Sequence, residues 1–508
     1  MHVSAKPPHS NEVSRAASRD LSPATTIFMV PAMTHRNADI AASAGTLAET
    51  NHWRVEMNAT VKLALPIALT QLGQVAMMTS DLMLIGHLGD KAIAAAALGQ
   101  TVLFAAFVVG MGLVSAVAPL AAQAFGAREP RMVRRSLRVG LWAAVLLGIP
   151  ATALQHLGED ILIATGQEPE SARLAGLYLI GLGWSLVPGW WFIALRGFMG
   201  AVNRPEPALW VTLVAIPINA LLAYALIYGT FGLPRLELLG AGIATTIVNL
   251  GMCVACVWIT YRQRPFRKYR VLGRLWRIDW PLLGRLIAVG APISGSFLLE
   301  YGLFATAAIM MGWISTTALA AHQIALQTAA ILFMVPFGIS MAATVRVGHA
   351  VGRHDAAATR RAGFAAIGLG AVFMAAMVLI VIALRHVIPL AFLGTATADT
   401  DATLVLAATL LLLGSTFFIV DGVQTVANGA LRGLNDTRVP LLFAAVSFWV
   451  IGFSTSYGLA FPAGLGAVGI WIGFTVGLGI YAGLLLWRFD ALTRRGYLPA
   501  TPGHTVAH

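Results

Sequence analysis

Three carboxylates lie inside stretches of the chain that are otherwise apolar. They are Asp81 in MMTSDLMLIG, Glu300 in GSFLLEYGLFA and Asp421 in STFFIVDGVQTV, and the whole sequence holds only 22 Asp and Glu residues. A charged acid costs about 2.5–3.5 kcal/mol at the centre of a membrane-spanning helix. One interpretation is structural, a hydrogen bond to a neighbouring helix, but Gln or Ser would supply that at lower cost. We favour the other interpretation, in which each acid serves an ion or proton site and receives a cation, a proton or water.

Polar side chains in other apolar stretches are candidates to support such sites. Asn219 follows the helix-interior Pro217, Thr245 lies in GAGIATTIVNL, and Gln71 shares a stretch with Asp81. A proline inside a helix frees a backbone carbonyl. For each polar residue alone, packing between helices is the more common role. Their combination with Asp81 predicts a supporting polar network.

One histidine and several aromatic residues have two interpretations each. His322, in LAAHQIAL, is a candidate proton relay, although a packing histidine is more common at such a position. Phe304, Phe417 and Trp449 are either core residues or the lining of a greasy cavity that would accept varied compounds. No nucleotide-binding GxxxxGK[ST] loop, metal-ligand spacing or nucleophile elbow occurs in the sequence. The energy source is therefore expected to be an ion gradient, without a cofactor or structural metal.

The composition identifies lipid as the solvent for most of this chain. Hydrophobic residues make up 58% of the 508 residues and charged residues 11%, against about 25% charged in typical soluble domains. These values exclude a soluble enzyme and a disordered regulator. The net charge of +12 does not indicate a nucleic-acid partner, because the basic residues are spread over short gaps between apolar stretches.

Twelve stretches are long and apolar enough to cross a membrane as helices. We predict an all-α integral membrane protein with twelve transmembrane helices in two six-helix lobes. The predicted spans are 61–86, 97–123, 137–155, 171–194, 207–229, 239–260, 286–311, 318–345, 363–384, 403–428, 439–461 and 466–487.

Basic residues fill alternate gaps between the spans, and the densest gap runs from Arg262 to Arg285. By the positive-inside rule, this gap and both termini are cytoplasmic. No Lys or Arg is expected deep within a span, because Arg196 and Arg432 fall in gaps. The predicted divisions are a disordered cytoplasmic tail (1–56), an N-lobe (57–261), a basic cytoplasmic linker (262–285), a C-lobe (286–488) and a cytoplasmic tail (489–508).

The two halves of the chain repeat each other at an offset of 226 positions. This offset pairs Pro66 with Pro292, and it pairs the double arginine at 134–135 with that at 360–361. The LRG at 195–197 has a counterpart at 431–433 at a slightly longer offset. Six spans separate the copies, so both have one membrane orientation, as in parallel-repeat transporters. The acids do not repeat, since Ala307 and Gln74 stand at the positions equivalent to Asp81 and Glu300.

Five segments resemble the multidrug and toxic compound extrusion (MATE) family, in particular its NorM-like bacterial branch. They are PIALTQLGQVAMMTSDLMLIGHLG, LLEYGLFA, AAHQIALQ, ISMAATVRVGHAVGR and DGVQTVANGALRGLNDTRVP. The resemblance covers nearly all of residues 60–488. It implies a multi-pass exporter in the bacterial inner membrane, which expels cationic amphipathic drugs in exchange for Na⁺ or H⁺ by alternating access.

The resemblance also implies roles for the acids. Asp81 resembles the first-lobe acid on helix 1, in a polar network that Asn219 and Thr245 would complete. Glu300 on helix 7 and Asp421 on helix 10 resemble the second-lobe pair implicated in binding the coupling cation, so they are the candidate Na⁺ ligands.

Two positions depart from the family pattern. Phe417 stands where that pattern has a Tyr, and Ala215 stands where it has a second Asn. Because Phe417 lacks the hydroxyl of that Tyr, the second-lobe site has one candidate Na⁺ ligand fewer, which favours protons as the coupling ion. The resemblance therefore leaves Na⁺ and H⁺ both open as coupling ion.

The leading hypothesis is a secondary multidrug antiporter. A lipid-linked precursor flippase of the same superfamily would show extra helices and a cationic cavity. An integral membrane enzyme would need a nucleophile or a metal cluster, and a passive channel would not need three unpaired acids on separate helices. We expect small cationic or zwitterionic drugs as cargo, membrane lipid around a monomer, and no nucleic-acid partner.

Overall fold

The structure is a computed structural model that describes residues 33–498 apart from 231, 272, 274 and 394–397. The chain divides into two compact units, Met1–His52 and Trp53–His508, and each is described by itself. In the first unit the described residues form the start of α1 (Met33–Gly86). Helix therefore covers residues 33–56 of the predicted disordered tail, where alanines favour helix. Residues 1–32 and 499–508 lie outside the described residues.

The second unit is helical, and no strand occurs among its described residues. Eleven helices are long and apolar enough to cross a membrane, or twelve if a pair bent by 44° counts as one span, in agreement with the prediction. In chain order the spans are Trp53–Gly86 of α1, α2 (Asp90–Ser115) with α3 (Val117–Gly126), α4 (Pro130–His156), the bent pair α6 (Pro169–Gly183) and α7 (Leu186–Ala201), α8 (Glu206–Tyr228), α9 (Glu237–Arg262), α10 (Trp280–Ile314), α11 (Thr316–Gly352), α12 (Ala356–Leu384), α14 (Ala398–Gly433), α15 (Arg438–Ala444) continuing through the π-helical η2 (Ala445–Phe453) into α16 (Ser454–Ala460), and α17 (Gly466–Arg494). Short helices α5 (Gly158–Ala164), η1 (Phe266–Tyr269) and α13 (Val387–Leu393) lie between them.

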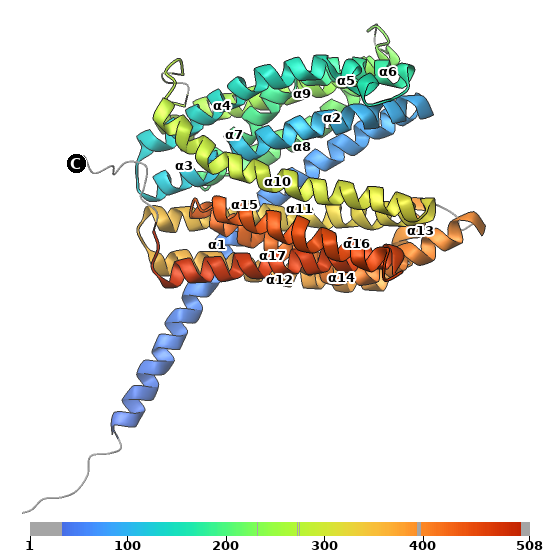
Figure 1. The fold of residues 1–508 in the computed structure, drawn as a ribbon. Coiled ribbons are helices and arrows are strands. Elements are labelled where there is room, and N and C mark those ends of the chain that lie inside the picture. Colours follow the sequence, from blue (N-terminus) through green and yellow to red (C-terminus); the bar gives the residue numbers. More distant parts are fainter. Residues whose placement is uncertain (1–32, 231, 272, 274, 394–397, 499–508) are drawn as a thin grey trace, which may run out of the picture. The chain divides into compact units, whose positions relative to one another are not determined.

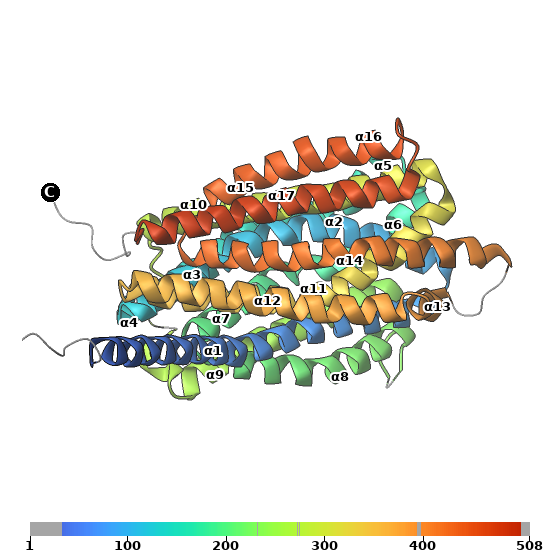
Figure 2. The same ribbon diagram turned by 90° about the horizontal axis from the view of Figure 1, so that it is seen from below.

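The helices of the second unit form two lobes. Helices α2–α9 gather in one group and α11–α17 in the other, with α10 running between them (Figure 1). In the C-lobe, α14 packs against α11, α12 and α17 (Figure 2). Large apolar side chains such as Val372 and Leu379 are 70% exposed on the outside. Such a surface suits lipid, because each helix satisfies its own backbone hydrogen bonds there.

The linker between the lobes is shorter than predicted. Helix α10 begins at Trp280, where the Asp279 carboxylate accepts from the backbone N–H of Leu282, so the linker covers 263–279 instead of 262–285. The linker is held against α4, because Trp142 Nε1 donates to the Leu275 carbonyl at 2.6 Å. Asp279 also receives the Arg135 guanidinium.

The internal repeat is confirmed in the helix boundaries. The second spans of the lobes, Asp90–Gly126 and Thr316–Gly352, begin and end at the same offset of 226, and the third spans begin at that offset as well. The turn after each second span contains a residue with positive φ, 59° at Arg128 and 58° at His354, again 226 apart. The two copies therefore share their turn geometry.

Repeat-related residues also exchange contacts between the lobes. A Cβ on Gly112 of α2 would collide with the backbone of Ser294 on α10. A Cβ on Gly338 of α11 would collide with the backbone of Ala68 on α1. Gly338 lies 226 positions after Gly112, and Ser294 lies 226 after Ala68. Each second span is thus in backbone contact with the first span of the other lobe, which requires glycine.

A second exchanged pair lies at the arginine-rich end of the same helices. A Cβ on Gly126 would collide with the His349 carbonyl oxygen. A Cβ on Gly352 would collide with the Gln123 carbonyl oxygen. Gly352 and His349 are the repeat counterparts of Gly126 and Gln123. The lobes therefore meet at this end through a two-fold related set of contacts.

Hydrogen bonds reinforce this end of the interface. Nε2–H of His349 donates to the carbonyl of Ala201 at 2.7 Å. Ala201 is the last residue of α7, in the other lobe. The Gln123 side chain donates to the Gly433 carbonyl at 2.8 Å, and Asn435 donates to the Gln123 oxygen at 2.8 Å. We call the contacts of Gln123, Gly126, His349 and Gly352 the crossed contacts. They must break if the lobes separate at this end.

Candidate functional site

The two C-lobe acids share one amide. Glu300 lies on α10 and Asp421 on α14, and Nε2 of Gln424 donates to one oxygen of each, at 3.1 Å in both cases. The same nitrogen is 3.1 Å from the hydroxyl of Thr425. The structure thus brings the two predicted acids together, and it adds Gln424, which the sequence interpretation did not single out.

This cluster has more acceptors than donors. A carboxamide carries two N–H hydrogens, whereas Gln424 faces three acceptor groups. Among the described residues, neither Glu300 nor Asp421 forms an ion pair. The cluster can therefore accept a proton or a small cation without displacing a protein cation.

The N-lobe acid sits in a different setting. Nδ2 of Asn219 on α8 donates to Oδ1 of Asp81 at 2.5 Å. The Thr245 hydroxyl on α9 lies 3.1 Å from Oδ2 of Asp81 and 3.1 Å from the Ala241 carbonyl. Asp81 is 8% exposed and Asn219 is fully buried. The predicted network of Asp81, Asn219 and Thr245 is present as a set of contacts.

Gln71 belongs to another contact. Its side-chain oxygen accepts from the Arg196 guanidinium, which also donates to Gln74 at 3.2 Å. Arg196 is buried within α7, so its predicted position in a gap is wrong, and so is the expectation that no arginine lies deep in a span. The helical segment runs past the predicted boundary because the apolar sequence GWWFIALRGFMG continues through the arginine.

The second LRG arginine has a related position in the C-lobe. The Arg432 guanidinium lies over the Phe297 ring, 4.8 Å from its centre. Position 297 is the repeat counterpart of Gln71, so each LRG arginine contacts the first span of its own lobe at an equivalent site. Neither arginine forms an ion pair with an acid within the described part of the chain.

The three predicted cavity-lining aromatics differ in burial: Phe417 is buried, Phe304 is half-buried and Trp449 is exposed. Phe417 is 1% exposed, and its ring meets those of Phe304, Trp471 and Phe474 at 5.4–6.2 Å between centres. In this conformation neighbouring rings cover Phe417. Trp449 is 37% exposed, and its indole N–H donates to the Leu299 carbonyl at 3.3 Å.

His322 adjoins the same aromatic cluster. Its ring is fully buried, 5.8 Å from the Trp471 ring between centres. Neither ring nitrogen has a hydrogen-bond partner among the described groups. The surroundings are those of a packing histidine, and no hydrogen bond among the described residues links it to Glu300 or Asp421.

No group of three or more His, Cys, Asp or Glu side chains is placed to hold a metal ion within residues 53–498 as described. A cation at the C-lobe site would have two carboxylates and neutral oxygens as ligands, which suits a weakly held ion that is taken up and released. The chain thus has two repeated six-helix lobes, and the acids inside them have few hydrogen-bond donors. These features define a membrane transporter built from parallel repeats.

Comparison with known proteins identifies the family. The MatE family model matches residues 66–225 and 292–457, the two repeats. A protein of Rhodopseudomonas palustris, named "Probable multidrug resistance protein NorM", is 63% identical over 466 residues, which cover 92% of this chain and 98% of the relative. A relative of the same name from Bradyrhizobium diazoefficiens is 59% identical over 445 residues, 88% of this chain and 95% of its own length. The chain belongs to the MatE family and is a transporter, not an enzyme.

Solved structures have the same fold. The crystal structure of the eukaryotic MATE transporter AtDTX14 matches with a TM-score of 0.77 at 22% identity, over 88% of this chain and 99% of that one. An outward-facing multidrug resistance MATE family transporter of the MOP superfamily matches with a TM-score of 0.75 at 20% identity, over 86% and 96%. The predicted two-lobed, twelve-helix fold class is confirmed.

Proposed function

We propose that this protein is a secondary active multidrug antiporter, which exports cationic amphipathic compounds in exchange for Na⁺ or H⁺. The relatives' name, multidrug resistance protein, supports drugs as the cargo. The observation that carries the coupling step is the pair of half-buried Glu300 and buried Asp421, which share the single amide of Gln424.

The acid pair supplies the difference in affinity that exchange requires. A ligand shifts a conformational equilibrium only by binding one state more tightly than the other. With no ion bound, the two carboxylates compete for one amide and repel each other. This repulsion destabilises the contact between α10 and α14. A proton or Na⁺ removes part of that charge and favours closer packing. Drug and ion then favour opposite lobe arrangements, with a coupling free energy on the order of 1–3 kcal/mol.

We further propose that the protein is a monomer in the bacterial inner membrane, with both termini and the crossed contacts on the cytoplasmic side. The positive-inside rule supports this orientation, because Arg128, Arg353 and the basic linker lie at the same end as these contacts. The described arrangement would then be closed to the cytoplasm.

The test is transport by the full chain in lipid vesicles. Ethidium movement is followed with either a pH gradient or a Na⁺ gradient imposed, and with each gradient collapsed by an ionophore as control. Exchange driven by one gradient identifies the coupling ion. If ethidium moves at the same rate whether the gradients are present or collapsed, coupled antiport is excluded.

Loss of resistance in cells gives an independent check. A strain that lacks its own drug exporters and expresses the chain should tolerate ethidium or a fluoroquinolone better than the strain with an empty vector. The flippase alternative expects no such difference. It also expects helices beyond the twelve spans that the described residues provide.

A further inference from the structure

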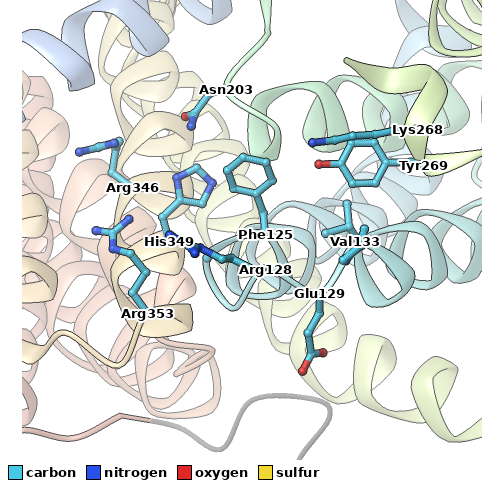
Figure 3. Close-up of a pocket in the computed structure, with 12 residues that line it drawn as sticks. Phe125, Arg128, Glu129, Val133, Asn203, Lys268, Tyr269, Arg346, His349 and Arg353 are labelled. Carbon is cyan, nitrogen blue, oxygen red and sulfur yellow. The ribbon is translucent and has the colours of Figure 1, made fainter. Parts of the chain in front are cut away.

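A cavity lies between the lobes beside the crossed contacts. Its volume is about 440 Å³. Figure 3 shows side chains that line it, which come from the end of α3 and the turn into α4, from the turn between α7 and α8, from η1 in the linker, and from the end of α11 in the C-lobe. The polar and charged residues that line it are Arg128, Glu129, Asn203, Lys268, Arg346, His349 and Arg353.

The cavity has an excess of cations. Four basic side chains line it, whereas Glu129 is the only acid in the lining. One of the four, Arg346, pairs with Glu56 at 2.6 Å, and its buried Nε has no hydrogen-bond partner among the described residues. The other three, Arg128, Lys268 and Arg353, form no ion pair within the described part of the chain.

The membrane orientation accounts for basic residues at this end but not for their convergence. Surface arginines usually spread apart and remain hydrated, because like charges repel one another. Here Arg128, Lys268 and Arg353, from three separate segments, line one cavity that Asn203 and Tyr269 also line (Figure 3). Guanidinium groups with free N–H donors, an ammonium and a carboxamide are the groups that recognise phosphate oxygens.

We propose that this cavity binds a phosphate group, carried by an anionic lipid headgroup or by a soluble phosphate. The ligand would contact Lys268 of the linker and Arg353 of the C-lobe at once. Such a ligand binds the arrangement in which the lobes meet at this end and loses half of its contacts when they part. By mass action it therefore stabilises the crossed contacts and regulates the lobe equilibrium.

The first test measures thermal unfolding of the purified full chain in detergent at constant ionic strength. One arm adds inorganic phosphate in place of chloride, and the other adds short-chain phosphatidylglycerol in place of phosphatidylcholine. A rise in the unfolding midpoint in either arm supports the proposal, and the arm that responds identifies the source of the phosphate. No rise in either arm overturns it.

Matched variants separate this site from general charge screening. The double variant Lys268→Gln, Arg353→Gln removes one cation from the linker side and one from the C-lobe side of the cavity. Its control, Arg267→Gln, Arg495→Gln, removes two exposed cations from η1 and the end of α17, neither of which lines the cavity. The cavity variant should bind the responding ligand at least about tenfold more weakly, since hydrogen bonds to charged groups contribute about 1.5–3 kcal/mol each. An equal loss in the control would overturn the proposal.

A conformational measurement tests the regulatory part without any transport assay. Spin labels at Arg131→Cys on α4 and Ala357→Cys on α12, both exposed, report the separation of the lobes at this end once buried Cys253 and Cys256 are replaced by Ala. The ligand should narrow the distance distribution toward the short distance, and the charge-conserving Lys268→Arg, Arg353→Lys variant should respond likewise. A ligand that raises the unfolding midpoint but leaves this distribution unchanged would refute the regulatory role.

Discussion

The acid sites of the two lobes differ in the number of hydrogen-bond donors available to each carboxylate. In the N-lobe, one carboxylate, Asp81, has two neutral donors, Asn219 and Thr245. In the C-lobe, Glu300 and Asp421 share the amide of Gln424. The N-lobe site is thus close to complete within the protein, whereas the C-lobe site lacks donors. A site that lacks donors is the one that gains most from a cation or proton, so we propose that coupling occurs in the C-lobe.

The largest expected effect is that of Glu300→Gln. An amide cannot bind a coupling cation as a carboxylate does, so gradient-driven ethidium transport in vesicles should fall at least about tenfold, the scale of one lost charge-assisted contact. Glu168→Gln, an exposed acid outside the cluster, is the matched control and should transport normally. Full transport by the Glu300 variant would make Glu300 a structural acid.

Asp421→Asn should separate drug binding from exchange. Because Asn resembles the neutral acid in charge and shape, the variant should still bind a fluorescent cationic drug weakly but should not exchange it against a gradient. Between low and high pH, or without and with Na⁺, the drug affinity of the variant should change less than about twofold. That of the native protein should change about fivefold or more, the lower end of typical coupling between two binding sites. Binding is measured over pH 5.5–8.5, with and without Na⁺. An ion dependence equal to that of the native protein would place coupling elsewhere, with Asp81 the next candidate.

Gln424→Leu should act in the opposite direction to the acid variants. The amide stabilises the ion-free carboxylates, so its removal makes the ion-free state less stable and ion binding tighter. The concentration of Na⁺ or H⁺ that half-saturates transport should fall by up to about tenfold, with a slower maximal rate because release is slower. The measurement is initial transport rate against ion concentration. A rise in that concentration instead would show that Gln424 is a direct ligand of the ion.

Asn219→Ala should have the smallest effect. It removes one donor from Asp81, a loss of about 1–3 kcal/mol in local stability, so transport should fall less than about tenfold while the half-saturating ion concentration stays within about twofold. The same rate measurements decide it. If the ion dependence shifts as strongly as in Gln424→Leu, the proposed division of roles between the lobes is wrong.

The sequence predicts the fold well because the information it needs is local. Span length and hydropathy locate all twelve helices, and the repeat fixes their division into lobes. The network of Asp81 with Asn219 was also accessible, because the polar residues in a spanning helix have few partners in lipid. Gln424 is also predictable as a partner of Asp421, because it lies three residues later, on the same face of a helix.

Other features depend on packing between distant segments. Phe417 is covered by rings from α10 and α17, which no local pattern reveals. The burial of Arg196 depends on Gln71 and Gln74, more than a hundred positions earlier. The basic cavity likewise assembles from segments that are far apart in the sequence, in both lobes and in the linker. Composition alone assigns such arginines to loops.

The crossed contacts have the geometry of a homodimer interface inside a single chain. In a two-fold symmetric dimer, if residue i of one subunit contacts residue j of the other, then j contacts i. Gly126 with His349 and Gly352 with Gln123 obey that rule across the repeat. A true homodimer must carry every substitution twice, in both subunits. The fused chain is free of that constraint, so it can hold an acid at Glu300 and an amide, Gln74, at the equivalent position of the other copy.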